Sequence, residues 1–244
     1  MTTLCFDFGN TRKKVAIFKD ASLQETLYLS DDDNETIHSL LKKFLPEKTI
    51  LSSVIHHNPD MEKLLAAHSM FHKLSAGTKI NFSVPVGKPE TIGADRLALT
   101  AAAVGVFPNK NNLIVALGSC ITYNFVSQYH AFLGGGISPG LDMRFKALHE
   151  HTALLPLVTA EWNFPLIGYD TNTNLQSGVI MGMAAEIGGT IAKYEEKYRN
   201  FNVVLTGGNS AYFAGQLKKE IFADHNFLFK GLYALSELNN CTKE

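Results

Sequence analysis

The sequence predicts an α/β protein whose two halves are organised alike. Apolar stretches with strand-like alternation, separated by turn residues, cover residues 3–8, 14–19 and 24–29 and predict a meander. Strand and helix patterns then alternate along the chain, as they do in α/β proteins. A second strand-turn-strand pattern at residues 113–132 indicates that the second half repeats the first in outline.

Composition sets limits on the class of protein. With 244 residues, of which 45% are apolar, the chain can bury a sizeable core, and we expect two modest domains. The formal net charge of −1 provides no basic field, so nucleic acid is not an expected partner. No apolar run approaches the roughly 20 residues of a membrane span, and we expect a soluble protein with no membrane partner.

The cysteines are three in number, widely spaced and without a Cys-x-x-Cys pair: Cys5, Cys120 and Cys241. This arrangement argues against a disulfide framework or a zinc site. It fits a reducing cytoplasm.

The meander is followed by a helix whose apolar residues Ile37, Leu40 and Leu41 have helical spacing and which ends before Pro46. The acidic stretch 31–34 precedes this helix. Carboxylates at a helix N-terminus cap free amides and favour the helix dipole, so we assign the stretch a capping role and no catalytic one.

A strand at 49–54 and a helix at 58–70 come next. His56 and His57 lie between them, but adjacent strand residues point to opposite faces and no further ligand is suitably spaced, so we expect a structural or solvent-facing pair. The proline-rich stretch 84–89 predicts an ordered loop.

In the second half, strands are expected at 113–120, 122–126, 131–132 and 203–205. The glycine-rich stretch 134–140 predicts a turn into a helix containing Met143, Phe145 and Leu148. A long, apolar helix rich in small residues is expected at about 174–199, and the chain is expected to close with a helix, a short strand at 227–229 and a last helix.

The turn after the first strand, Asp7-Phe8-Gly9-Asn10-Thr11, is followed by Lys14. A carboxylate at a strand end, a glycine where backbone must approach a ligand, a Thr hydroxyl and a Lys suit a magnesium-bound polyphosphate. Asp, Gly and Asn also favour ordinary turns, and the residues alone leave both interpretations open. The chain has no Gly-x-x-x-x-Gly-Lys-Ser/Thr phosphate loop.

A second informative stretch, Gly93-Ala94-Asp95-Arg96, opens an apolar helix. Asp at a helix start is commonly a cap, and a neighbouring Arg is commonly solvated. The pair could instead supply a carboxylate that accepts a proton from an alcohol and a guanidinium that grips a substrate carboxylate. Spacing alone does not choose between these roles.

The ordered set of motifs resembles the type III pantothenate kinases. It comprises the stretches 7–11, 93–96 and 135–140, then Gly168 and Thr171 ahead of Ser177-Gly178, and finally Leu205-Thr206-Gly207-Gly208. The resemblance extends over nearly the whole chain.

The resemblance implies an actin-like ATPase fold with two related, ribonuclease H-like α/β domains, 1–111 and 112–244, and a nucleotide cleft between them. It implies transfer of the ATP γ-phosphoryl group to the 4′-hydroxyl of pantothenate, the first step of coenzyme A biosynthesis. It also implies Mg²⁺ with ATP, a monovalent cation (K⁺ or NH₄⁺), and a cytoplasmic homodimer.

Site residues follow from the same motifs. Asp95 corresponds to the catalytic base, and Gly93, Ala94 and Arg96 complete the pantothenate-binding motif. Thr171 corresponds to a substrate-contacting Thr that reaches the site from the other subunit. The positions implied at ATP include Asp7, which would also hold magnesium, and Gly207 and Gly208 beside the adenosine; the others are Phe8, Gly9, Asn10, Thr11, Arg12, Lys13, Lys14 and Ser119.

Three positions depart from the family pattern. Ala116 and Asn124 stand where the family has Asp, and Val86 stands where it has a pantothenate-side Tyr. The family carboxylate at the position of Ala116 helps to bind the monovalent cation, so we expect that cation site to be weak or absent here.

These departures leave two alternatives: a nucleotide- or pantothenate-binding regulatory relative with weakened catalysis, or another small-alcohol kinase of the same superfamily. Retention of four residues favours a kinase over a binding protein: Asp7, Lys14, Asp95 and Arg96. Retention of the whole Gly-Ala-Asp-Arg motif favours pantothenate as the acceptor.

Overall fold

The computed structural model describes residues 1–85, 87–217 and 221–240. Contacts group these residues into two compact units: 1–109 with 126–133 and 226–240, and 110–125 with 134–217 and 221–225. This grouping differs from a single boundary at 111/112, because residues 126–133 and 226–240 belong to the first unit. The division of the chain into domains 1–111 and 112–244 stays a prediction.

The first unit is built on a five-stranded sheet with the order β3-β2-β1-β4-β5. Strands β1 (Thr2–Phe8), β2 (Lys13–Lys19) and β3 (Ser22–Leu29) form the expected antiparallel meander. Strands β4 (Lys48–Ser53) and β5 (Met70–Lys73) extend it in parallel on the other side of β1. The sequence pattern missed β5, because the expected helix 58–70 included its first residue, Met70, and the three residues that remain form too short a run to indicate a strand.

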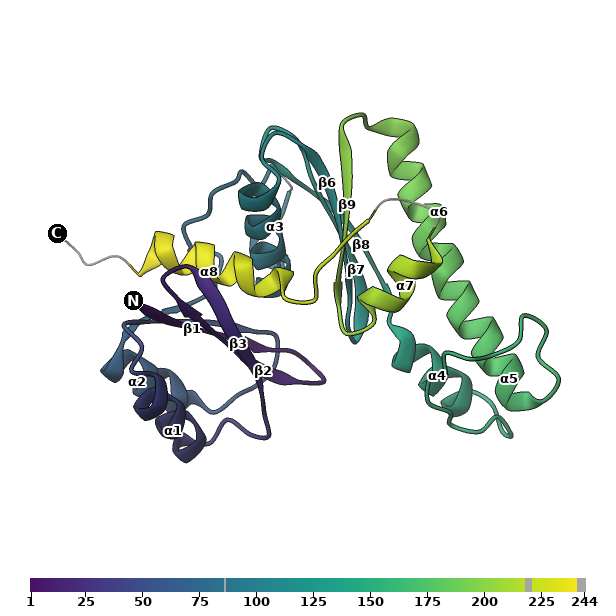
Figure 1. The fold of residues 1–244 in the computed structure, drawn as a ribbon, viewed down its shortest axis with the longest axis horizontal. Helices are drawn as coiled ribbons and strands as arrows, with labels where there is room; N and C mark the ends of the chain where they lie inside the picture. The colour runs from purple at the N-terminus through teal and green to yellow at the C-terminus, as the bar shows by residue number, and fades with distance from the viewer. Residues whose placement is uncertain (86, 218–220, 241–244) are drawn as a thin grey trace. The chain divides into compact units, whose positions relative to one another are not determined.

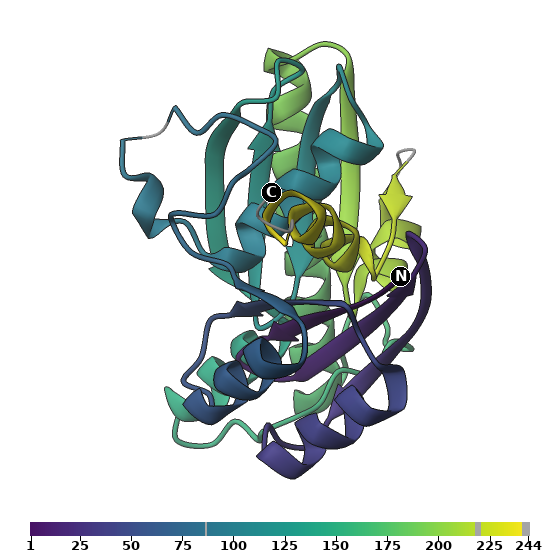
Figure 2. The same ribbon diagram turned by 90° about the vertical axis from the view of Figure 1, so that its left-hand side faces the viewer.

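Helices cover both faces of this sheet (Figures 1 and 2). Helices α1 (Asn34–Phe44) and α2 (Pro59–His68) pack on the face that presents Leu4, Phe6 and Phe8 of β1. Helix α8 (Phe227–Asn239) covers the other face together with α3 (Ala94–Val106), which follows a short 3₁₀ turn η1 (Pro89–Thr91).

The last helix crosses α3 closely. A Cβ atom on Gly231 of α8 would lie 1.8 Å from the Ala98 carbonyl oxygen, so this crossing needs glycine. The strand expected at 227–229 is wrong, because Phe227 and Phe229 are buried residues in the first turn of α8. A short apolar run does not distinguish a strand from a buried helix.

The second unit repeats the topology of the first, with the order β10-β9-β6-β7-β8. Its strands are β6 (Asn111–Leu117), β7 (Cys120–Val126), β8 (Phe132–Pro139), β9 (Phe201–Gly207) and β10 (Phe222–Ala223). Strand β6 is central and pairs in parallel with β9, as β1 pairs with β4. The expected repetition between halves is therefore confirmed at the level of strand order.

The glycine-rich stretch 134–140 was expected to be a turn, and this expectation is wrong for most of it. Gly134, Gly135 and Gly136 belong to β8, which continues to Pro139. A Cβ on Gly135 would lie 1.8 Å from the Tyr123 carbonyl oxygen, so the glycine permits close approach of two strands.

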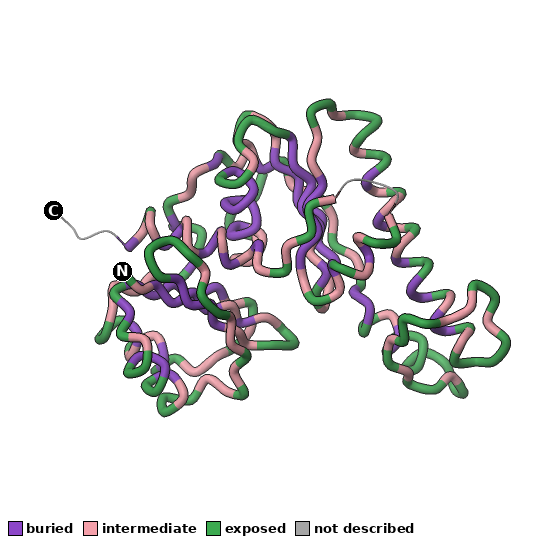
Figure 3. Tube along the Cα trace, viewed as in Figure 1, coloured by how far each residue is buried: buried purple, intermediate pink, exposed green. Residues whose placement is uncertain are grey.

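The core of the second unit lies between its sheet and the helices α4 (Leu141–Glu150), α6 (Gly182–Lys197) and α7 (Ser210–Gln216). The expected long helix is present as α5 (Thr171–Gln176), a π-helical turn η2 (Ser177–Met181) and α6 in direct succession. Figure 3 shows that buried residues are concentrated in the strands. Within the described residues, no helix is long and apolar enough to cross a membrane.

Candidate functional site

The turn between β1 and β2 borders a cavity. The Gly9 amide donates to the Arg12 carbonyl oxygen at 3.1 Å and closes the hairpin tip. Residues 9–13 line a cavity of about 450 Å³ together with Tyr28, Leu29, Ser30 and Ile55. The expected strand-turn-strand is confirmed, and most of the expected phosphate segment lies beside an open space.

Asp7 and Lys14 project from the same face of the sheet, because they are register partners in β1 and β2. Burial is the largest cause that raises the pKa of Asp7 to about 7; Lys14 lowers it, and the charge of Asp95 raises it further. The structure thus brings together three residues that the sequence placed in two separate motifs.

Ser52 is a further residue of this group, and sequence reasoning missed it. It is the register partner of Asp7 in the parallel pair of β1 and β4, so both side chains lie on one face. Ser52 is fully buried, and its hydroxyl has no hydrogen-bond partner among the described residues. Only the strand register could have identified it, because Ser is common in strand ends and turns.

The side-chain oxygens of Asp7 and Ser52 are suitable ligands for a magnesium ion. Mg²⁺ is commonly held by one or two carboxylates, with substrate phosphates and water completing its octahedron. Asp7 offers a carboxylate and Ser52 an unpaired hydroxyl beside it. The described residues contain no group of three or more His, Cys, Asp or Glu that could hold a metal, so the remaining ligands would be phosphate oxygens and water.

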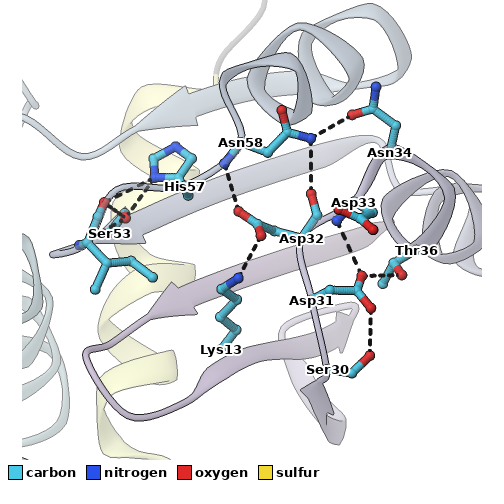
Figure 4. Close-up of polar contacts among 11 residues, drawn as sticks. Lys13, Ser30, Asp31, Asp32, Asp33, Asn34, Thr36, Ser53, His57 and Asn58 are labelled. Atoms are coloured by element: carbon cyan, nitrogen blue, oxygen red, sulfur yellow. Dashed lines mark hydrogen bonds and ion pairs between the residues drawn. The ribbon is translucent and has the colours of Figure 1, made fainter.

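Lys13 projects to the opposite face from Asp7. Its register partners are Phe8 and Leu29, which belong to or pack against the core beneath α1 and α2. Its ammonium lies 2.6 Å from Asp32 Oδ1 (Figure 4). The two neighbouring lysines therefore have different surroundings. Lys14 lies beside Asp7, whereas Lys13 lies on the opposite face and pairs with Asp32.

The acidic stretch before α1 does not cap that helix with its side chains. Asp33 is the N-cap residue but makes no side-chain capping bond. Asp31 accepts hydrogen bonds from Ser30 and Thr36 Oγ1, and Asp32 accepts from Lys13 and from the amide of Asn58. The expected capping of helix amides by these side chains is wrong, because Asp31 and Asp32 accept from other donors; the carboxylates still precede the helix N-terminus, where the dipole favours them.

His57 is structural, as expected. Its Nδ1 lies 2.9 Å from Ser53 Oγ, and its Nε2 lies 2.8 Å from Glu62 Oε1. Glu62 also pairs with Lys73 at 2.6 Å.

Asp95 lies in the first turn of α3. Burial is the main cause that raises its pKa, against the lowering effects of the Arg96 amide and the Arg96 charge. A Cβ at Gly93 would lie 2.5 Å from Asp95 Oδ1, so glycine leaves room for this carboxyl. The Arg96 guanidinium carbon lies 5.4 Å from the centroid of the Phe132 ring.

In the second unit, Ser119 lies two residues after the end of β6, and Gly207 ends the neighbouring strand β9, where it is the register partner of Leu117. Gly207 has a φ of 96°, and a Cβ there would lie 2.3 Å from the Leu117 carbonyl oxygen. The Gly140 amide donates to the Ser119 carbonyl oxygen at 3.1 Å. Gly208 is exposed, with open space where a Cβ would stand.

The three residues that differ from the family pattern lie in different surroundings. Ala116 occupies the position in β6 that Asp7 occupies in β1, and its register partner in β9 is Thr206. Asn124 is buried and donates to Thr122 Oγ1 at 3.0 Å. Val86 lies outside the described residues.

Thr171 is the first residue of α5 and follows the N-cap Asp170, which forms a capping box with Thr173. It lines a largely apolar cavity of about 870 Å³ in the second unit, together with Arg144 and Asn174. Arg144 in turn bonds Ser138 at 3.0 Å and pairs with Glu186, which accepts from the Tyr123 hydroxyl. The sequence analysis did not single out this polar network, because its members come from β7, β8, α4 and α6.

Comparison with known families gives one consistent answer. The family model of the type III pantothenate kinases matches residues 3–193. The type III pantothenate kinase of Christiangramia forsetii is 42% identical over 238 residues, which cover 97% of this chain and 98% of that relative. That of Bacteroides fragilis is 40% identical over 241 residues, with 97% and 98% covered.

Solved structures show the fold. A Baf family protein from Campylobacter jejuni superposes with a TM-score of 0.64 at 20% identity, covering 97% of this chain and 98% of that one. A ROK family protein from Streptococcus pneumoniae in complex with sucrose gives 0.53 at 11% identity, with 99% and 100% covered. The expected fold is confirmed as the actin-like ATPase fold. The match of the family model and the identity over almost the whole length establish that this chain belongs to the type III pantothenate kinase family.

Proposed function

We propose that this protein transfers the γ-phosphoryl group of magnesium-bound ATP to the 4′-hydroxyl of pantothenate, as the first step of coenzyme A biosynthesis. As a member of its family, the chain is an ATP-dependent kinase. The observation that carries the assignment of roles is that Asp7 and Lys14 share one face of the first sheet, with Asp95 close enough for its charge to raise the pKa of Asp7. Phosphoryl transfer depends mainly on positioning and on neutralising charge, and these groups can supply both.

Asp95 acts as the general base in this proposal. Its pKa is raised, mainly by burial, and a carboxylate whose pKa moves toward neutrality accepts a proton from an alcohol more readily. Arg96 next to it pairs with the carboxylate of pantothenate. Gly93 and Ala94 complete the motif by leaving room for the Asp95 carboxyl and opening the helix.

ATP contacts the hairpin between β1 and β2 through its phosphates. Lys14 supplies positive charge on the face of Asp7, and Asp7 with Ser52 would hold Mg²⁺, whose role is to neutralise charge on the phosphates. We assign a second phosphate contact to Ser119, and contacts with the adenosine to Gly207 and Gly208. A side chain at Gly207 would collide with Leu117 of the paired strand β6, so the structure explains this glycine by strand pairing, and its place beside the adenosine rests on the family motif.

The active species is proposed to be a homodimer, with Thr171 completing the site of the partner. Gly178, Gly182 and Gly189 are exposed on the long helix, and none has an atom within 4 Å of where its Cβ would stand, so another helix could approach closely. Leu166 and Ile167 nearby in the chain are 70% and 83% exposed. A fully active monomer, detected by light scattering at assay concentration, would refute the dimer.

We propose that the reaction takes place in the cytoplasm, and the free thiols of Cys5 and Cys120 support a reducing compartment. We propose that activation by a monovalent cation is weak, because Ala116 supplies no carboxylate.

A direct assay tests the function. Purified protein is incubated with ATP, magnesium and pantothenate, and 4′-phosphopantothenate is sought by mass spectrometry. Product formation that Asp95→Asn abolishes supports the proposal. Absence of product under varied potassium, ammonium and pH would instead favour the binding or regulatory alternative, and turnover of a different alcohol would favour another kinase of the superfamily.

A further inference from the structure

We infer that Lys13 anchors the phosphate-binding hairpin and does not act as a phosphate ligand, and that Asp32 is a positioning residue that holds this anchor. The inference rests on the proposed function, because it assumes that the hairpin tip at residues 9–12 receives the ATP phosphates. It assigns separate tasks to two adjacent lysines of one segment.

The strand register separates the two lysines. Lys14 is paired with Asp7 across β1, whereas Lys13 is paired with Phe8. Side chains of successive strand residues point to opposite faces, so Lys13 is directed to the core beneath α1 and α2. Its ammonium lies 5.9 Å from the centroid of the buried Phe8 ring, and its side chain is 25% exposed.

Asp32, which lies between β3 and α1, contacts both Lys13 at the start of β2 and Asn58 at the start of α2 (Figure 4). One carboxylate oxygen lies 2.6 Å from Lys13 Nζ at the start of β2, and the other accepts the Asn58 amide at 2.7 Å. The Asn58 side chain donates to the Asp32 carbonyl oxygen at 3.2 Å and, through its own oxygen, caps α2 at the Asp60 amide. Asp32 therefore ties the hairpin base to the start of α2.

The ion pair is suited to holding a fixed geometry. The Asp32 side chain is only 13% exposed. Burial alone would raise the pKa of Asp32, but hydrogen bonds from Lys13 and Asn58 outweigh it and hold the pKa below its ordinary value. Asp32 is thus ionised at neutral pH, and a partly buried pair is screened less by salt than an exposed one.

The anchor lies where the geometry of the hairpin matters for phosphate binding, because Lys13 directly follows the tip. Lys13 lines the same cavity as residues 9–12, and the Gly9–Arg12 bond closes the tip. Backbone amides that bind phosphate must be held close to the productive geometry, and a misplacement of about 1 Å can cost roughly 100-fold in rate. Fixing the residue directly after the tip limits that misplacement.

A phosphate-binding Lys13 would behave differently. If Lys13 paired with ATP, Asp32 would compete with the phosphates for its charge, and removal of that charge would strengthen ATP binding. If Lys13 is an anchor, loss of either partner loosens the same hairpin. The two interpretations therefore predict opposite effects of Asp32→Asn on the KM for ATP.

The test compares Lys13→Met, Asp32→Asn and the double variant. Asn can keep the oxygen that accepts the Asn58 amide, but it places an NH2 group where an oxygen accepted from Lys13, so Asp32→Asn breaks the pair with Lys13 and spares the bond to Asn58. The exposed pair of Asp60 and Lys63 provides the control Asp60→Asn, the same change on α2, which should leave the kinetics within about 2-fold, since exposed pairs contribute little. KM for ATP, KM for pantothenate, kcat and amide hydrogen exchange of the ligand-free protein are measured.

Each single variant is expected to speed exchange in residues 9–12 and to raise the KM for ATP about 3–10-fold without changing the KM for pantothenate. The double variant should be no worse than the worse single variant, because one pair is lost in each. A lower KM for ATP in Asp32→Asn, or unchanged exchange in residues 9–12, overturns the inference. A general loss of kcat and melting temperature, with both KM values unchanged and exchange faster throughout the first sheet and not mainly in residues 9–12, also overturns it, because that result marks a purely structural pair.

A further variant and the exchange measured without ATP separate failure of the anchor from failure of the proposed function. If a neutral variant unfolds, Asp32→Glu keeps the charge but lengthens the side chain, and it should speed exchange in residues 9–12 while sparing β4. Exchange is measured without ATP, so it tests the anchor even if the proposed function fails. Faster exchange with no effect on ATP would show that the hairpin is anchored but is not the phosphate site.

Discussion

The charge of Asp95, in the first turn of α3, raises the pKa of Asp7 at the end of β1, so the two carboxylates lie within electrostatic reach of each other. Burial is the larger cause of the shift, and Lys14 opposes both. Two like charges kept close together in a folded protein store an electrostatic cost that a cation or a phosphate-bound metal would relieve.

Asp95→Asn should abolish most turnover and spare ATP binding, because Asp95 is assigned to the acceptor alcohol. General-base removal typically costs about 10²–10⁴-fold in kcat. The same variant should raise the melting temperature of the ligand-free protein, since the raised pKa of Asp95 means that its ionised form is disfavoured in the folded state. Enzyme assay, ATP titration and thermal unfolding measure the three effects; kcat within a few-fold of wild type would defeat the assigned role.

Gly93→Ala should lower kcat with little loss of stability. Gly93 has a φ of −58°, which alanine adopts without strain, but the new Cβ would lie 2.5 Å from Asp95 Oδ1. The carboxyl must move, and a displaced base loses rate. Steady-state kinetics and thermal unfolding check this, with Gly105→Ala as a control in the same helix, where a Cβ meets nothing within 4 Å. Equal kcat in both variants would show that the position of Asp95 is not critical.

Asp7 should make the metal-free protein less stable as pH rises from about 4 to 7. Its pKa is raised from 3.8 to about 7 on folding, so over this range the unfolded state has lost the proton that the folded state still holds. The destabilising contribution of Asp7 to the free energy of unfolding is absent below about pH 4, close to the pKa of the unfolded state. It reaches its full size, up to ~4 kcal/mol, above pH 7. The difference in unfolding free energy between Asp7→Asn and wild type, measured with EDTA, should therefore grow across this range. A difference that does not vary with pH would contradict the assignment.

The same carboxylate belongs to the metal side of the proposed site. Asp7→Ala should weaken magnesium-dependent ATP binding as well as catalysis, and unchanged ATP affinity in magnesium would count against that role.

Ser52→Ala should weaken Mg-ATP binding without destabilising the ligand-free protein. A buried hydroxyl without a partner costs roughly 1–3 kcal/mol, so its removal is expected to be neutral or stabilising. Thr3→Val is the matched control, because the Thr3 hydroxyl is also buried and unpaired on the same face of β1, but four residues from Asp7. Calorimetric titration with Mg-ATP should show weaker binding for Ser52→Ala alone. Equal binding in both variants would remove Ser52 from the site.

Replacing sodium by potassium or ammonium at constant ionic strength should change the rate little. A monovalent cation beside phosphates needs oxygen ligands, and Ala116 offers no carboxylate at the strand position that Asp7 fills in the first unit. Ala116→Asp should introduce a response to potassium or ammonium. Strong, saturable activation of the unmodified protein would show that other oxygens build the cation site.

Local sequence determined most of the elements and the identity of the motifs. Alternation in residues 3–29 predicted the meander, and the Gly-Ala-Asp-Arg stretch marked the start of α3, because period and turn chemistry are written in neighbouring residues. Where local signals were ambiguous, the predictions were wrong. The glycines of β8 and the first turn of α8 were misjudged, since strand pairing with Tyr123 and packing against Ala98 decide them.

Tertiary structure alone decided which side chains share a face. The sequence shows Lys13 and Lys14 as equals, but the register of β1 and β2 directs one to Asp32 and the other to Asp7. Ser52 joins Asp7 only through the parallel pairing of β4 with β1, across 45 residues of chain. A shift of one residue in either register would exchange these faces, and long-range pairing sets that register through burial of a whole strand face, which no short motif contains.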